Sequence, residues 1–292
     1  MATERLRGNY TLPAERLAFL DVEPELDVRE LSPGLWTVSD GSYRTVFADG
    51  PDGVIAWDTL STPGRARAYR RAIGREISTV VYSNDHLDRS GWCSELAPDA
   101  ERVAHEWCAH VVELRGADGQ LPVTRTFAHD TIVGPAELVF PGPISGTGNV
   151  ATYFPEQRVL YAPDTVLPDA RYSLLPDWHI ANFSTSLHSL LALDFETFVP
   201  GRGEVMTRQE YARGVEFLDA VHDESQRAFA ESVAVWLFDA IEGFVKERLA
   251  DEWSGLEGFD DHVGIMAFRV AHHYLTGGWS IEDTAAGRPQ GL

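Results

Sequence analysis

The sequence predicts an α/β fold, a four-layer αββα sandwich with a C-terminal helical extension. In the first two thirds of the 292-residue chain, a β-meander leads into alternating strand and helix patterns, and this succession then occurs a second time. Two similar halves of this kind can pack two mixed sheets face to face, with helices on the outside. Beyond Pro200 the apolar residues recur only at helical spacing. We therefore expect a leader at 1–30, the sandwich at 31–205 and the helical extension at 206–292.

Alternating apolar residues, turn residues and β-branched runs define the elements of the two halves. In the first half they predict strands at 34–38, 43–48 and 54–58, a helix at 63–73, strands at 77–82 and 103–105, and a helix at 106–114. In the second half they predict strands at 131–133, 137–140, 150–154 and 158–161, a helix at 184–193 and a last strand at 197–200.

Three helices are expected in the extension. Thr207 and Glu210 have the spacing of a capping box, which predicts that the first helix begins there. Apolar residues at helical spacing predict a second helix at about 224–249 and a third at about 262–275. These helices would either cover the mouth of a site or bury a dimer contact, so together with the leader they are candidate contacts of a homodimer.

The composition excludes several classes of function. A formal charge of −21 and a pI near 4.7 argue against nucleic-acid and anionic-membrane partners, because both need a basic protein surface. The N-terminal residues lack the apolar core of a secretory signal, and no segment reaches the ~18 apolar residues of a membrane span. Only Cys93 and Cys108 occur, and we expect both to be reduced and buried in a cytoplasmic protein.

A polar stretch at 83–91 follows the apolar, β-branched run that predicts the strand at 77–82. Its side chains should therefore lie at the C-terminal end of a buried strand, where open α/β sheets carry their chemistry. The stretch holds one histidine, His86, between the carboxylates of Asp85 and Asp88. We expect the functional site here.

Residues 84–89, Asn-Asp-His-Leu-Asp-Arg, resemble the His-x-His-x-Asp-His signature of the metallo-β-lactamase superfamily. Five further segments are similar to other landmarks of this family, in the same order and with similar spacing. They are the strand ending in Asp58, the strand and following residue at 103–106, the Gly-Pro-rich segment at 142–149, the strand and loop at 160–164 ending in Asp, and the Val-Pro-Gly segment at 198–203. The resemblance covers about 31–205 and implies the αββα fold.

The same resemblance implies a metal site that has lost most of its ligands. In the family, five histidines and two aspartates bind two metal ions, usually zinc, which turn a water into hydroxide. The first metal's three histidine positions hold Asn84, His86 and Ser145, the second metal's positions hold Asp88, Arg89 and Arg202, and the bridging carboxylate is Asp164. Arginine has no lone pair to give the second metal, and at the first site Asn84 is a poor ligand and Ser145 normally none, so we expect no cofactor. The alternative is a single zinc or iron ion on His86 and Asp164, completed by Asp85 or His179.

Without a metal-bound hydroxide, the chemistry must come from side chains. We expect His86, Asp88 and Asp164 to act as acid or base, and His179, on the loop after Asp164, to border the site. The arginines at the second metal's positions, Arg89 and Arg202, would either pair only with the neighbouring carboxylates or also clamp a small anionic substrate, with Asn84 and Ser145 as hydrogen-bonding groups.

These acid or base residues and the arginine clamp suit a lyase, an isomerase or rearrangement enzyme, or a hydrolase of activated esters. Two alternatives remain open at this point. One is a binding or scaffold protein that has lost activity, and the other is a mononuclear metal-dependent hydrolase with atypical ligands.

Overall fold

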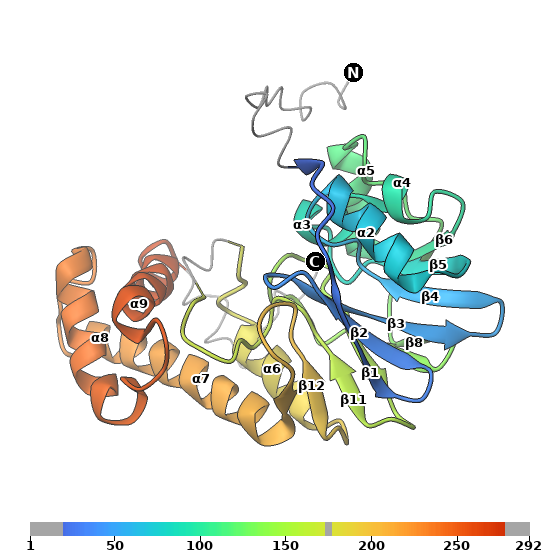
Figure 1. Ribbon diagram of the computed structural model, residues 1–292. Helices are drawn as coiled ribbons and strands as arrows, with labels where there is room; N and C mark the ends of the chain where they lie inside the picture. Colours follow the sequence, from blue (N-terminus) through green and yellow to red (C-terminus); the bar gives the residue numbers. More distant parts are fainter. Residues whose placement is uncertain (1–19, 173–176, 278–292) are drawn as a thin grey trace.

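The computed structural model describes residues 20–172 and 177–277 (Figure 1). Most of the predicted leader lies outside the described residues. Its last part does not: β1 (Asp27–Ser32) forms the first strand of a sheet, pairing with the strand that follows it, so the sheet begins earlier than its apolar pattern indicates. The residues of β1 are largely exposed, which removes the alternation that would have revealed this strand.

The first sheet, within the described residues, has seven strands in the order of the sequence. They are β1, β2 (Leu35–Ser39), β3 (Arg44–Gly50), β4 (Gly53–Trp57), β5 (Ile77–Val81), β6 (Glu101–His105) and β7 (Arg125–Phe127). The first four strands pair antiparallel and the last four pair parallel. Helices α2 (Pro63–Ile73), α3 (Leu87–Ser90), α4 (Cys93–Leu96) and α5 (Glu106–Arg115) form the crossovers, and Figure 1 shows them on one face of this sheet.

The second sheet has six strands in the described part of the chain. They are β8 (Thr131–Val133), β9 (Ala136–Val139), β10 (Ala151–Phe154), β11 (Val159–Tyr161), β12 (Thr197–Val199) and β13 (Met206–Thr207). The strand predicted as the last one, β12, runs parallel to β11, and the short β13 follows it at the edge. Strands β7 and β13 were not predicted: the residues of β7 are largely exposed, and β13 has only two residues.

The two sheets pack face to face through one apolar layer. Trp57 and Val81 of the first sheet meet Phe154, Tyr161 and Val199 of the second, and all five side chains are buried. A second core lies under helices α2, α4 and α5, and contains the unpaired thiols of Cys93 and Cys108. The predicted αββα sandwich is therefore confirmed.

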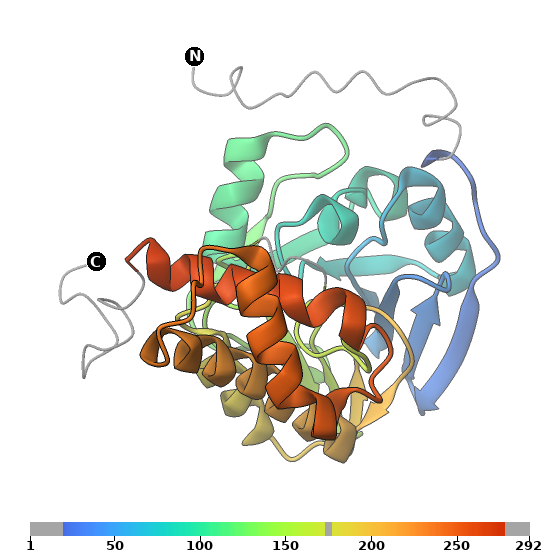
Figure 2. The ribbon, with the colours of Figure 1, turned by 90° about the vertical axis from the view of Figure 1, so that its left-hand side faces the viewer.

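The helical extension covers the outer face of the second sheet. Its helices are α7 (Arg208–Ala230), α8 (Phe238–Trp253) and α9 (Phe259–Leu275), and α6 (Phe183–Leu191) joins β11 to β12. Figure 2, which turns the extension toward the viewer, shows α8 and α9 stacked on α7. One continuous apolar core joins the sheet to all four helices, so the extension packs as part of the sandwich.

The boundary between the first two helices of the extension differs from the prediction. The second helix was expected to begin near Glu224, but α7 continues to Ala230 and the break falls at 231–237. Apolar residues keep helical spacing through 224–230, and no proline or glycine marks the break itself. Ser232 reverses the chain with a φ of 58°, and buried Val235 holds the connection against the core. No helix among the described residues is long and apolar enough to cross a membrane.

Candidate active site

The site lies where strands of both sheets end. Asp58, directly after β4, accepts hydrogen bonds from the backbone N–H of Ser83 (2.9 Å), from its hydroxyl (2.7 Å) and from the hydroxyl of Tyr161 (2.6 Å). Burial raises the pKa of this carboxyl group. Because Ser83 follows β5 and Tyr161 is the last residue of β11, Asp58 ties the polar stretch after β5 to the second sheet.

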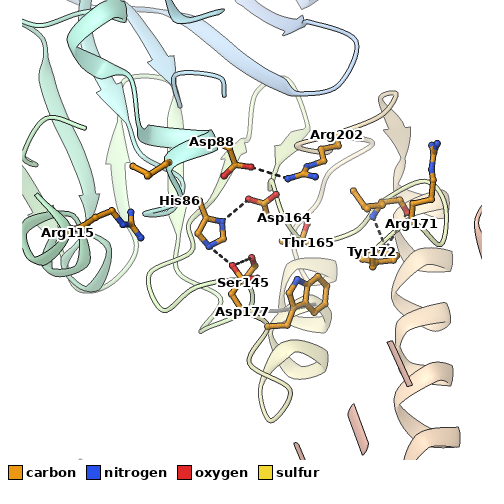
Figure 3. Close-up of a pocket in the computed structure, with 13 residues that line it drawn as sticks. His86, Asp88, Arg115, Ser145, Asp164, Thr165, Arg171, Tyr172, Asp177 and Arg202 are labelled. Atoms are coloured by element: carbon orange, nitrogen blue, oxygen red, sulfur yellow. Dashed lines mark hydrogen bonds and ion pairs between the residues drawn. The ribbon is translucent and has the colours of Figure 1, made fainter. Parts of the chain in front are cut away.

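An open cavity of about 500 Å³ lies above these strand ends (Figure 3). Charged and polar side chains form much of its lining, together with three bulky apolar or aromatic residues on the loop after β11. The lining comprises His86, Leu87, Asp88, Arg115, Ser145, Asp164, Thr165, Leu167, Arg171, Tyr172, Asp177, Trp178 and Arg202. Its volume falls within the usual range for sites that bind small molecules.

Arg89 and Asp164 form a buried, bidentate ion pair. The guanidinium Nη2 and Nε atoms donate to the two carboxylate oxygens at 2.6 and 3.0 Å, and Nη1 donates to the carbonyl of Gly201 at 2.9 Å. Burial alone would raise the pKa of Asp164, but Arg89 and His86 hold it well below its usual range. Arg89 is only 1% exposed and does not line the cavity.

His86 lies between two carboxylates. Its Nε2 atom is 2.5 Å from Asp177 Oδ2, and its Nδ1 atom is 3.6 Å from Asp164 Oδ2. Burial would lower the pKa of His86, but the hydrogen bonds and charges of Asp164 and Asp177 outweigh it and raise the pKa to about 10. At neutral pH His86 is therefore an imidazolium, which can donate a proton but cannot accept one.

Asp88 and Arg202 form a second pair at the rim of the cavity. Arg202 Nη2 donates to Asp88 Oδ2 at 3.1 Å, and the hydroxyl of Tyr43 donates to the same oxygen at 2.9 Å. The Tyr43 ring lies against both arginines, with the Arg202 and Arg89 guanidinium carbons 4.7 and 5.1 Å from its centre. Arg202 keeps 48% of its side chain exposed, so it can contact a ligand while it stays paired.

Of the remaining predicted residues, Ser145 lines the cavity, whereas Asn84 and His179 do not. Ser145 lines the cavity and donates to Asp177 Oδ2 at 3.1 Å. Asn84 is fully buried and donates to Asp164 Oδ2 at 2.9 Å, so it supports the site from behind. His179 does not line the cavity; its backbone N–H donates to the carbonyl of Ile144, and its own carbonyl accepts from the first turn of α6.

Sequence reasoning missed the residue nearest to His86. Asp177 stands two positions before His179 on the loop that was expected to border the site, but no motif marks it. Arg115, at the end of α5, lines the cavity and donates to Asp85 Oδ2 at 2.6 Å, although its helix gave no functional signal. Arg115 and Asp177 follow His86 by about 30 and about 90 residues in the sequence. Motif spacing cannot link residues so far apart, so only the fold brings them together.

The donor set does not fit a divalent metal ion. Asp164 already accepts from Arg89 and Asn84, and both ring nitrogens of His86 face carboxylates. Zinc and iron need deprotonated histidine nitrogens and carboxylate lone pairs. Across 20–172 and 177–277, no group of three or more His, Cys, Asp or Glu side chains could hold a metal ion.

Residues 40–202 match the family model described as the metallo-β-lactamase superfamily, which covers more than half of the chain. The chain belongs to the metallo-β-lactamase superfamily. Solved metallo-β-lactamases share its fold: the mono-zinc form of FIM-1 from Pseudomonas aeruginosa superposes with a TM-score of 0.60 at 16% identity, over 67% of this chain and 95% of that one. The enzyme from Hirschia baltica also reaches 0.60, at 13% identity, over 66% of this chain and 97% of its own.

Two relatives from Nocardioides sp. (strain JS1661) extend the similarity beyond this superfamily core. The α subunit of 2,4-dinitroanisole O-demethylase is 36% identical over 273 residues, covering 89% of this chain and 83% of its own. The β subunit is 31% identical over 274 residues, covering 88% and 84%. These alignments are longer than the superfamily match at 40–202, so they also include residues of the helical extension.

Proposed function

We propose that this protein is a metal-independent enzyme in which His86 and Asp177 carry out acid and base catalysis on a small substrate that is, or becomes, anionic. The observation that carries the proposal is the contact between His86 Nε2 and Asp177 Oδ2, 2.5 Å apart on the wall of an open cavity. Behind it, the guanidinium of Arg89 supplies a positive charge beside the bridging carboxylate. The cavity itself favours an enzyme over a scaffold protein.

The relatives' names suggest the reaction to test first. O-demethylation of dinitroanisole acts on an aryl ether whose ring is electron-poor because of its nitro groups. A ring of this kind can be attacked by water at the carbon that bears the ether oxygen, without a metal-bound hydroxide. We therefore propose hydrolysis of an activated aryl ether or ester. Cleavage of an unactivated amide or phosphodiester is not proposed.

For a methyl ether, the proposed reaction has two steps. Water adds to the ring carbon while Asp177 accepts its proton, and the negative charge spreads over the ring and its nitro groups. The bond from the ring carbon to the methoxy oxygen then breaks, and His86 donates its proton to the departing oxygen. The products are a phenol and methanol, and the catalytic pair regains its charges when the proton passes from Asp177 to His86, 2.5 Å away.

Three further residues have supporting roles in this proposal. Asp164 orients His86 and keeps it charged, since it lies 3.6 Å from Nδ1. Arg202 at the rim and Arg115 at the opposite side of the cavity stabilise the negative charge of the intermediate (Figure 3). Preorganised positive groups of this kind supply a large share of catalysis in reactions that develop negative charge.

The test combines metal analysis with two variants. Protein purified without a histidine tag should contain no stoichiometric metal and should release nitrophenolate from dinitrophenyl ethers or nitrophenyl esters in the presence of chelator. The variants His86→Gln and Asp177→Asn should lower kcat by about 10²–10⁴-fold, the usual contribution of general acid–base groups.

His188→Gln is the matched control, because His188 also pairs with a carboxylate, Asp219 at 2.6 Å, but lies outside the cavity. It should keep full activity. Stoichiometric zinc, iron or manganese would overturn the metal-independent mechanism, and full turnover by His86→Gln would remove the proposed acid.

We also propose that the protein assembles as a homodimer, that is, with a second copy of this chain. The two relatives are named as α and β subunits of one enzyme. In this chain, the connection between α7 and α8 exposes a cluster of large apolar side chains: Trp236 is 65%, Leu237 54% and Phe238 37% exposed. A homodimer that Trp236→Glu converts to a monomer, measured by light scattering after gel filtration, would support this surface; a wild-type monomer at all concentrations would exclude it.

A further inference from the structure

Three cavities meet at one side chain. The candidate active-site cavity, a smaller cavity of about 180 Å³ and another of about 310 Å³ all have Leu167 in their lining. Leu167 is half-buried and packs against the core of the helical extension. It therefore stands as a partition between the active-site cavity and two neighbouring spaces.

The two neighbouring cavities differ in chemistry. Toward α7 and α8, the 180 Å³ cavity is bounded mainly by apolar side chains, among them Met206, Phe217, Trp253 and Leu256. Toward the β2–β3 turn, the 310 Å³ cavity is bounded by Arg171, Arg202, Asp169 and Ser42. An opening at Leu167 would thus extend the active site into an apolar space on one side and a charged space on the other.

The backbone around Leu167 is held from both sides. Its own N–H donates to the hydroxyl of buried Tyr172 at 2.7 Å. Three residues on, the N–H of Ala170 donates to the carbonyl of Glu257, in the turn between α8 and α9, at 3.0 Å. Arg171 pairs with the carboxylate of the same Glu257 at 2.9 Å.

The next residue of that turn, Gly258, has a φ of 80°, and a Cβ there would lie 2.5 Å from Arg171 Cγ. The turn is therefore pressed against the segment that carries Leu167. Truncation of the leucine side chain should open the partition without moving this backbone, because the hydrogen bonds that hold it involve only main-chain atoms and other side chains.

We infer that Leu167 is a specificity-determining residue that limits the substrate to a single small aromatic ring by closing the active-site cavity against the apolar cavity beyond it. The ring would lie against Trp178 and Tyr172, whose own rings meet edge to face at 5.8 Å in the cavity wall. An apolar substituent on that ring would need the space toward Phe217 and Trp253, which Leu167 blocks. The inference rests on the proposed function for the class of ligand.

The test compares the binding of two phenolates that differ only in bulk. Isothermal titration calorimetry gives the Kd of 2,4-dinitrophenolate and of 2-cyclohexyl-4,6-dinitrophenolate for wild-type protein and for Leu167→Ala. We expect wild type to bind the smaller phenolate more tightly, and Leu167→Ala to shift the ratio of the two Kd values by at least 10-fold toward the larger one. Leu167→Val should give an intermediate shift, and it covers the case in which the alanine variant does not fold.

Two control variants isolate the partition. Leu256→Ala enlarges only the apolar cavity, and Leu87→Ala enlarges only the active-site cavity at another wall, so neither should change the ratio. An unchanged ratio in folded Leu167→Ala and Leu167→Val would overturn the inference, as would wild-type protein that binds neither phenolate. Size-selective binding without any turnover would overturn the proposed function alone.

Discussion

The proton on His86 holds two carboxylates of the site together. The pKa of this group is raised to about 10 in the folded protein, against an ordinary value of 6.5, so the folded state holds the proton more tightly than the unfolded chain does. The resulting stabilisation is fully present below about pH 6.5 and is lost as the pH rises through about 10.

Activity and stability should therefore fall together between about pH 9 and 11. The pH dependence of kcat would report loss of the acid, and urea unfolding across the same range would report loss of the ion pairs. In His86→Gln this part of the stability profile should disappear, whereas His188→Gln should leave it in place. A wild-type kcat that stays constant through pH 11 would contradict the role of His86 as the acid.

Tyr43 is a positioning residue for Arg202. Its hydroxyl donates to Asp88, which pairs with Arg202, while its ring lies against the same guanidinium. Tyr43→Phe keeps the ring contact and removes the hydrogen bond, which has a net value of about 1 kcal/mol. We expect KM to rise about 3–10-fold with kcat little changed, the signature of lost uniform binding.

Tyr153→Phe serves as the control for this change, because the hydroxyl of Tyr153 donates to the carbonyl of Asp194 and the residue lies outside the cavity. Its kinetics should match those of wild type. A fall in kcat for Tyr43→Phe at constant KM would instead place the hydroxyl in the chemical step.

For some residues of the site the sequence indicates the position, but not whether the side chain is buried or exposed. The sequence pointed to His86, Asp164 and Ser145 through the family resemblance, because these positions are fixed by strand ends that the motifs mark. It could not separate Arg89, which is buried against Asp164, from Arg202, which lies exposed at the rim. Their difference comes from the carboxylate that each one faces, Asp164 for Arg89 and Asp88 for Arg202, and that is a property of the packed fold.

At the scale of elements, the capping box at the start of α7 anchors the longest helix described. The Thr207 hydroxyl accepts from the N–H of Glu210, and the Glu210 carboxylate accepts from the N–H of Thr207. Thr207→Ala should lower the free energy of unfolding by about 1 kcal/mol, since it removes the N-cap acceptor. Urea denaturation measures this loss; Thr207→Ser should recover most of it, and equal stability of all three proteins would contradict a stabilising cap.

Elements with a strong period were predicted well, and those defined by their partners were not. Strands β4 and β5 and the capped start of α7 are predicted by the pattern of their own residues. The exposed strand β1 is defined by its pairing with β2, and the break between α7 and α8 by the packing of buried Val235 in the core of the helical extension. The periodicity of their own residues does not show either contact.

At the scale of the whole molecule, the excess of acidic residues should make stability depend on salt. With a formal charge of −21, most pairs of distant surface charges repel one another, and salt screens this repulsion. Raising the sodium chloride concentration from about 20 mM to about 500 mM screens most of this repulsion. We expect Tm to rise by about 2–4 °C, which corresponds to about 1 kcal/mol in the free energy of unfolding. A fall in Tm would mean that attractive surface ion pairs outweigh the net repulsion.

The buried guanidinium of Arg89 has a consequence for how the site is assembled. A metal ion must be delivered to a protein, competes with other ions for its ligands and can be withdrawn by a stronger binder. The positive charge beside Asp164 is instead the side chain of Arg89, which is part of the chain itself. It becomes fixed when β11 and the polar stretch at 83–91 come together. A cell that makes this protein supplies the charge through translation alone, whatever its stores of zinc or iron.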